Sequence, residues 1–327
     1  MQMPTETDWF QQKKKAVEEW NQNPDLCGRL YDEFFDKFVW TETAASWDDF
    51  LAWLNEFKGT WCFRGQREAC WTLQTSLDRA ARVNTPNGHH HLDREIAERE
   101  LLFRFKQQAH HYIRHLPSED DRASWLALMQ HYGVPTRLLD WTQSPYVALY
   151  FAIEEAPQGI EEEKSKGDRF RDKGKEKHSA IWAIDMDWLA RKEKELLGSV
   201  PDDPEARTEY RNRLLDQKEK PLVARIEPKQ SNERMFAQQG VVLWKLFEKE
   251  PYFDQFLIDM MVHPVTQEPP VISRLRVGEN LRLEFLEKLR MMNIYRASLF
   301  PGLDGFCRSL KLDLEIKAER EGRMAQV

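Results

Sequence analysis

The sequence predicts an α+β fold built around a mixed or antiparallel sheet of about six strands. Short segments rich in β-branched and aromatic residues are bounded by turn residues, a pattern typical of strands. Helical segments fall between them in irregular order, which disfavours a strictly alternating, doubly wound fold. The 327 residues are 41% hydrophobic and 12% aromatic, which is enough to build a large core.

The expected elements follow from these patterns. Strands are expected at 60–64, 136–141, 180–185, 222–226, 241–247 and 271–277. Residues 8–57 are expected to be helical and residues 66–92 loop-rich. Further helices are expected near 93–115, 122–132, 146–155, 187–197, 203–218, 252–262, 279–292 and 303–316.

Local signals predict where several helices begin and end. Ser46 and Ser144 are expected N-caps, the latter because Pro145 suits the first helical position. A capping box beginning at Ser118 is expected to open the helix at 122–132, and Gly133 to end it in a left-handed conformation.

One main domain is expected over residues 45–310, with a helical extension at 1–44 and a C-terminal helix and tail at 311–327. Residues 157–178 contain almost no apolar side chain and are expected to form a mobile charged insertion.

Composition narrows the class of protein. The 48 Lys and Arg against 55 Asp and Glu give a net charge of −7, so the chain lacks a broad basic field for duplex binding, although a local basic groove is not excluded. Four cysteines without disulfide spacing, no secretory leader and no apolar run of ~18 residues predict a cytoplasmic protein with no membrane partner.

The first motif is Phe63-Arg64-Gly65-Gln66, at the end of an expected strand. The Arg64 guanidinium suits a carboxylate or phosphate, and Gly65 would let a ligand or backbone approach closely. The alternative is that Arg64 pairs internally with an acid such as Asp140.

The second motif runs from His131 to Pro145 and crowds a histidine, an arginine, an aspartate and two hydroxyl residues. His131 could act as an acid or base, and the helix start at Ser144 offers free amides to an anion. The alternative is turn chemistry alone, which explains Gly133 and Pro145 but not the packing of His131, Arg137 and Asp140.

The third motif is Ser231 to Gly240, between two expected strands, where polar side chains either reach a cleft or form a short solvated helix. The histidines at 89–91, 110, 111 and 115 lack companion ligands at metal-binding spacing, so no metal is expected. No Walker A, Gly-x-Gly-x-x-Gly, Gly-x-Ser-x-Gly or His-Glu-x-x-His motif is present.

Together these segments resemble the FRG domain, a family named for its Phe/Tyr-Arg-Gly motif. The matching segments are 63–66, 73–79, 131–152, 232–240 and 299–305, so the resemblance spans roughly residues 45–310. The family name describes a motif and implies no reaction.

A weaker similarity is to arginine-type ADP-ribosyltransferases, which carry an aromatic-Arg-Gly strand followed by a Ser/Thr strand and a Ser-Pro-x-Val-Ala-like helix. It implies an ADP-ribosyltransferase-like sheet, NAD as substrate, Arg64 as its clamp, and Thr142 or Ser144 as supporting hydroxyls. Such enzymes also need a late glutamate, where this chain has Gln238-Gln239-Gly240, so Asp140 or Asp304 would have to supply the acid.

The resemblances imply a nucleotide-binding effector that transfers ADP-ribose to a protein or nucleic acid, or hydrolyses NAD, as a bacterial toxin or anti-phage component with a regulatory partner protein. Two alternatives stay open: a nuclease-like effector with Arg64, Arg79, Arg137 and Arg234 along a groove, and a noncatalytic sensor or partner-binding module. The candidate catalytic residues are Arg64, His131, Asp140 and Gln239, and the candidate cofactor-binding residues are Arg64, Gly65, Tyr132, Arg137, Thr142 and Ser144.

Overall fold

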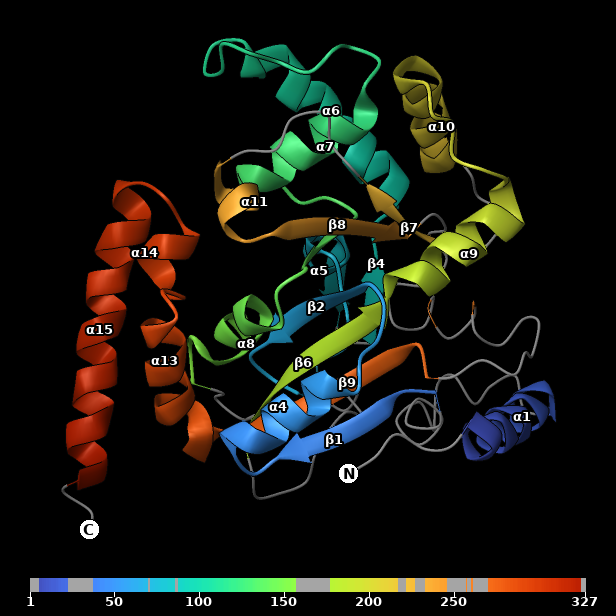
Figure 1. Ribbon diagram of the computed structural model, residues 1–327. Coiled ribbons are helices and arrows are strands. Elements are labelled where there is room, and N and C mark those ends of the chain that lie inside the picture. Colours follow the sequence, from blue (N-terminus) through green and yellow to red (C-terminus); the bar gives the residue numbers. More distant parts are fainter. Residues whose placement is uncertain are drawn as a thin grey trace.

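The computed structural model describes residues 6–22, 38–69, 71–85, 88–156, 177–216, 222–226, 233–245, 257, 260 and 270–324. Within these residues it has mixed α/β architecture, with twelve α-helices and one open seven-stranded sheet of order β1-β9-β6-β2-β5-β8-β7 (Figure 1). The strands are β1 (Trp40–Ala44), β2 (Trp61–Gln66), β5 (Leu138–Thr142), β6 (His178–Asp185), β7 (Val223–Ile226), β8 (Gly240–Lys245) and β9 (Ile272–Gly278).

The sheet is mixed, as the sequence predicts, because β1 runs parallel to β9 and every other neighbouring pair is antiparallel. The prediction of about six strands was one short. The additional strand is β1, within a stretch predicted to be helical; its pairing with β9 is a tertiary contact that local propensity does not reveal. A separate hairpin of β3 (Arg82–Thr85) and β4 (Gly88–His91) lies in the region expected to be loop-rich.

Most helices fall within the expected segments, but Ser76–Ala80 is helical where a loop was expected, and the helix expected at 93–115 ends at Ala109. The helices are α1 (Glu6–Gln22), α4 (Trp47–Asn55), α5 (Ser76–Ala80), α6 (Arg94–Ala109), α7 (Arg122–His131), α8 (Pro145–Ile153), α9 (Met186–Leu197), α10 (Pro204–Asp216), α11 (Glu233–Ala237), α13 (Arg282–Met291), α14 (Arg296–Leu299) and α15 (Leu303–Met324), with a 3-10 turn, η1 (Glu279–Leu281), before α13. The charged insertion lies outside the described residues apart from 177 and His178, and His178 begins β6. Most of the helix expected at 252–262 also lies outside them.

Two of the predicted N-caps are confirmed and one is wrong. Ser46 and Ser144 cap α4 and α8 through their hydroxyls, with Pro145 in the first turn of α8. The predicted capping box at Ser118 was wrong, because Asp121 caps α7 by accepting the Ser124 amide at 3.1 Å. Gly133 ends α7 with a φ of 81°, as predicted.

The two faces of the sheet are buried by different helices. Phe63 and Ala183 face a core with α4, α8 and α13, whereas Cys62 and Trp182 face a core with α7 and α9. This alternation along β2 and β6 is the period-two pattern of a sheet covered on both faces. Among the described helices, none combines the length and the apolar character needed to cross a bilayer.

Candidate functional site

A pocket of about 430 Å³ lies between α7 and α11, over strands β5 and β8. In Figure 1 these two helices lie beside each other above β8. Helix α7 lines the pocket with residues spaced as one face of a helix, namely Ser124, Ala127, Leu128 and His131. Such a volume falls within the range of small-molecule sites.

Ionisable side chains of several kinds line this pocket, among them His131 from α7, Asp140 from β5 and Arg234 from α11. The Arg234 guanidinium lies over the Phe300 ring, 4.5 Å from its centroid. Within the described part of the chain it makes no hydrogen bond or ion pair, so its donors can bind an anionic ligand. Burial lowers the pKa of Arg234, the charge of Arg296 lowers it further, and Asp140 opposes the change.

The Asp140 carboxylate is held by a short chain of hydrogen bonds. The Gln130 amide donates to Asp140 Oδ1 at 2.5 Å, and the Gln130 carbonyl accepts from the Thr136 hydroxyl at 2.5 Å. Thr136 is itself fixed, because its amide donates to Ser76 Oγ at 3.0 Å. The carboxylate is therefore oriented toward the pocket by groups from α5, α7 and the turn before β5.

The His131 imidazole is the titratable group suited to accept a proton. Burial lowers the pKa of His131 below its usual value, and the positive charge of Arg234 lowers it further. The ring is therefore neutral at pH 7, so one nitrogen can act as an acceptor. Tyr132 lines the same pocket, with 60% of its surface exposed and its ring 4.8 Å from that of His131.

The Phe-Arg-Gly motif lies next to the pocket and does not line it. The Arg64 Nη1 donates to the backbone carbonyl of Asp140 at 2.5 Å. Gly65 has a packing role, because a Cβ there would lie 2.1 Å from the Ala148 carbonyl oxygen and 2.5 Å from the Ala152 amide. Gly65 was expected to contact a cofactor. In the structure it instead allows β2 to pack closely against α8.

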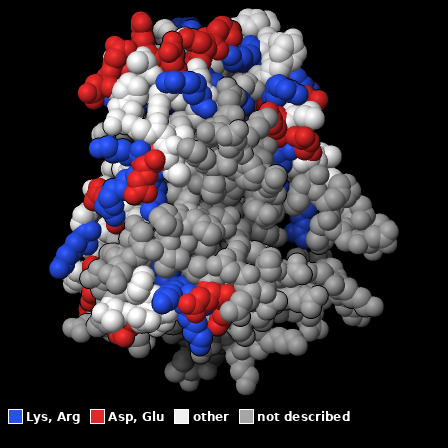
Figure 2. Space-filling model, turned by 90° about the vertical axis from the view of Figure 1, so that its right-hand side faces the viewer, with Lys and Arg blue, Asp and Glu red and all other residues white. Residues whose placement is uncertain are grey.

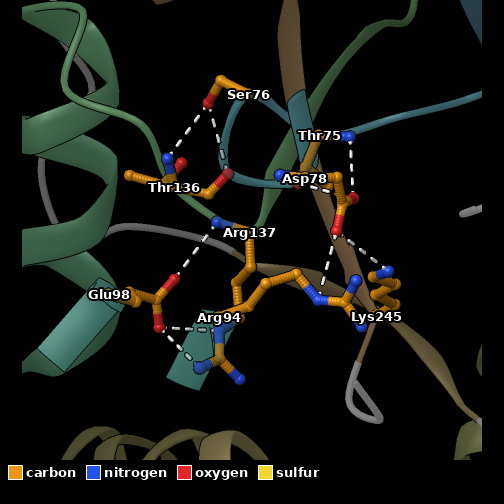
Figure 3. Close-up of polar contacts among 8 residues, drawn as sticks. All are labelled: Thr75, Ser76, Asp78, Arg94, Glu98, Thr136, Arg137 and Lys245. Atoms are coloured by element: carbon orange, nitrogen blue, oxygen red, sulfur yellow. Dashed lines mark hydrogen bonds and ion pairs between the residues drawn. The ribbon is translucent and has the colours of Figure 1, made fainter. Parts of the chain in front are cut away.

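Arg137 is not available to a ligand. Its Nε and Nη2 each lie 2.6 Å from Glu98 Oε2, and both residues are buried (Figure 3). The hydroxyls of Thr142 and Ser144 are also engaged internally. Thr142 donates to the Gln238 carbonyl at 2.7 Å, and Ser144 accepts the Val147 amide as the cap of α8. The expected cofactor contacts of these three residues therefore become structural contacts.

Of the two glutamines before β8, Gln238 lines the pocket and Gln239 does not. Gln239 is exposed in a turn with a φ of 48°, and its carbonyl accepts the Gln143 amide at 3.0 Å. Sequence reasoning gave no site role to Gln130 and named Arg234 only in the groove alternative. The helical spacing of the α7 residues was a signal that could have identified that wall of the pocket. Ser231 and Asn232 of the third motif lie outside the described residues.

The arginines of the groove alternative do not share one surface. Arg64 and Arg137 are turned inward, and Arg79 donates to the Gln74 carbonyl at 2.7 Å. Figure 2 shows acidic and basic side chains interspersed over the described part of one face of the molecule. A continuous basic track is therefore not seen on the described part of that face.

Comparison with known families finds a match for one part of the chain. A family model for the FRG domain matches residues 59–161, a stretch that runs from before β2 to beyond α8 and includes Arg64, His131 and Asp140. No curated protein and no solved structure matches the chain. Residues 59–161 are therefore an FRG domain, and His131 and Asp140 of the pocket lie within it.

Proposed function

We propose that the pocket between α7 and α11 binds NAD or a related nucleotide and cleaves its N-glycosidic bond, and that the sheet is of the ADP-ribosyltransferase type. The observation that supports this most is the meeting of a carboxylate, a neutral imidazole and an uncommitted guanidinium in one pocket. Asp140 would supply the acid that the late Gln238-Gln239 segment lacks.

Each group has a defined task in this reaction. Arg234 binds the phosphates, because a guanidinium matches their oxygens and Phe300 holds it in place. The bond between ribose C1′ and the nicotinamide nitrogen breaks with its electron pair leaving on nicotinamide. The Asp140 carboxylate stabilises the positive charge that develops on the ribose.

The nucleophile completes the step. Water, or a hydroxyl or other nucleophile of an acceptor macromolecule, attacks C1′ and loses a proton to His131, whose lowered pKa leaves the imidazole free to accept it. Water gives ADP-ribose, and a macromolecular acceptor gives an ADP-ribosylated product. In either case NAD is consumed, which fits a toxin or antiviral effector.

The experiment is to incubate the purified protein with NAD and measure released nicotinamide, with and without cell extract as a source of acceptor. Asp140→Asn should lower the rate roughly 100-fold, because it removes charge at the reacting centre. Asp304→Asn is the matched control: this second candidate acid is 82% exposed on α15, lies beside Arg308 and does not line the pocket. Release that is absent from the wild-type protein under both conditions would reject the enzymatic proposal and favour a noncatalytic module.

A further inference from the structure

The seven-stranded sheet opens between β2 and β5. These two strands pair at a single position, Phe63 with Thr142, whereas β2 pairs with β6 over six positions and β5 pairs with β8 over five. The residues of β5 that precede Thr142 do not pair with β2. The carbonyl of Asp140 lies in this unpaired stretch, two residues before Thr142.

The side chain of Arg64 bridges the opening. It follows Phe63 in β2, and its Nη1 donates to the Asp140 carbonyl at 2.5 Å, replacing the missing strand-to-strand hydrogen bond. Burial lowers the pKa of Arg64 to about 10, with the charge of Arg79 adding to the effect and Asp140 opposing it, so the guanidinium stays charged at pH 7. Among the described residues, the Arg64 Nε is buried and has no hydrogen-bond partner. The residue as a whole is partly exposed, and its Nη1 donates to the residue that carries the pocket carboxylate.

Asp140 is thus fixed on its main chain and on its side chain. Pairing with Val242 of β8 fixes the backbone of Asp140 in β5, Arg64 donates to its carbonyl, and Gln130 donates to its carboxylate. The charged groups that face it are Arg64 from β2 and Arg234 from α11. Arg234 lines the pocket, whereas Arg64 does not.

We propose that Arg64, the arginine of the Phe-Arg-Gly motif, is a positioning residue that fixes Asp140 and its charge in the pocket without touching the ligand. This inference rests on the proposed function for its kinetic consequences. Its structural basis, a β2 side chain that supplies a hydrogen bond absent from the sheet, is independent of the substrate.

The experiment compares Arg64→Met, which removes the charge and the hydrogen bond, with Arg64→Lys, which keeps the charge but not the fork of donors. Two kinds of quantity are measured: the carbon-13 chemical shift of the Asp140 backbone carbonyl in the ligand-free protein, and kcat and KM for nicotinamide release. The resonance is assigned with Asp140→Asn. The surface variant Arg308→Met controls for loss of an arginine.

Positioning predicts that Arg64→Met shifts the Asp140 carbonyl resonance, because the hydrogen bond to this carbonyl is lost. It also predicts that kcat falls roughly tenfold or more, with KM within about twofold of the wild type. Arg64→Lys should shift the Asp140 carbonyl resonance less and lower kcat less. If Arg64→Met does not fold, the comparison of Arg64→Lys with the wild type provides the test. A KM raised roughly tenfold with kcat retained would show direct ligand binding and overturn the inference. An Asp140 carbonyl resonance unchanged in Arg64→Met would also overturn the inference, and this measurement stands even if the wild-type protein does not turn over NAD.

Discussion

Glu98 of α6 and Arg137, the residue before β5, form a buried ion pair. The Glu98 side chain is fully buried, its Oε2 contacts two nitrogens of Arg137 at 2.6 Å, and its Oε1 accepts the Arg137 amide at 3.1 Å. Asp78 holds Lys245 at 3.4 Å beside this pair (Figure 3). These contacts fix the strands that form the floor of the pocket.

Replacing Glu98 with glutamine should destabilise the fold strongly. The change leaves the Arg137 charge buried without its counterion, which costs about 3–5 kcal/mol in comparable pairs. Urea unfolding followed by circular dichroism measures the loss. Glu315→Gln is the control, because its contact with Lys311 is exposed on α15 and should change stability by less than about 0.5 kcal/mol. Equal, small losses in both variants would mean that the pair does not hold the fold together.

Gly65→Ala should also destabilise the protein, and without involving any ligand. The new methyl group would overlap the Ala148 carbonyl oxygen, which belongs to the helix backbone and cannot rotate away. We expect a loss of about 3 kcal/mol, with α8 displaced from β2. Gly322→Ala is the matched control: nothing lies within 4 Å of its Cβ, and alanine favours the helix. A Gly65→Ala protein with the melting temperature of the wild type would contradict the packing role and favour a ligand-binding role for this glycine.

The His131 side chain should make stability depend on pH. Because its pKa is lowered in the folded protein, the unfolded chain holds more protons, and the free energy of unfolding falls as the pH drops below the ordinary histidine value of about 6.5. His131→Gln should flatten this part of the pH–stability curve. Arg234→Met should raise the imidazole pKa, measured by proton NMR, because a neighbouring positive charge is removed. An imidazole pKa that falls in this variant would contradict the arrangement of the two side chains.

Much of the fold could be predicted from local signals. Residues such as Ser144-Pro145 and Gly133 mark where helices begin and end without any tertiary information, and the structure confirms these helix ends. Strand β1 was missed because its five residues acquire strand geometry by pairing with β9, more than two hundred residues away. The Ser118 box was misplaced because Asp121 offers a better-positioned carboxylate three residues later.

The candidate site was harder to predict, because residue type does not reveal which way a side chain faces. Sequence reasoning brought His131, Tyr132 and Asp140 to a common site, and all three line the pocket. It could not foresee that Glu98, 39 positions from Arg137 in the sequence, would bind that arginine. Arg234 enters the pocket through the contact of α11 with α14, which no local pattern encodes.

The most direct test of the proposed site is calorimetric titration of ADP-ribose, a product that does not react further, into the wild-type protein and Arg234→Met. We predict saturable binding to the wild type and binding at least roughly tenfold weaker in the variant, since a lost charge-assisted contact costs about 1.5–3 kcal/mol. Arg308→Met should bind like the wild type, because that arginine is exposed on α15. Absence of binding to the wild type, or equal affinity in the wild type and Arg234→Met, would contradict a nucleotide site between α7 and α11.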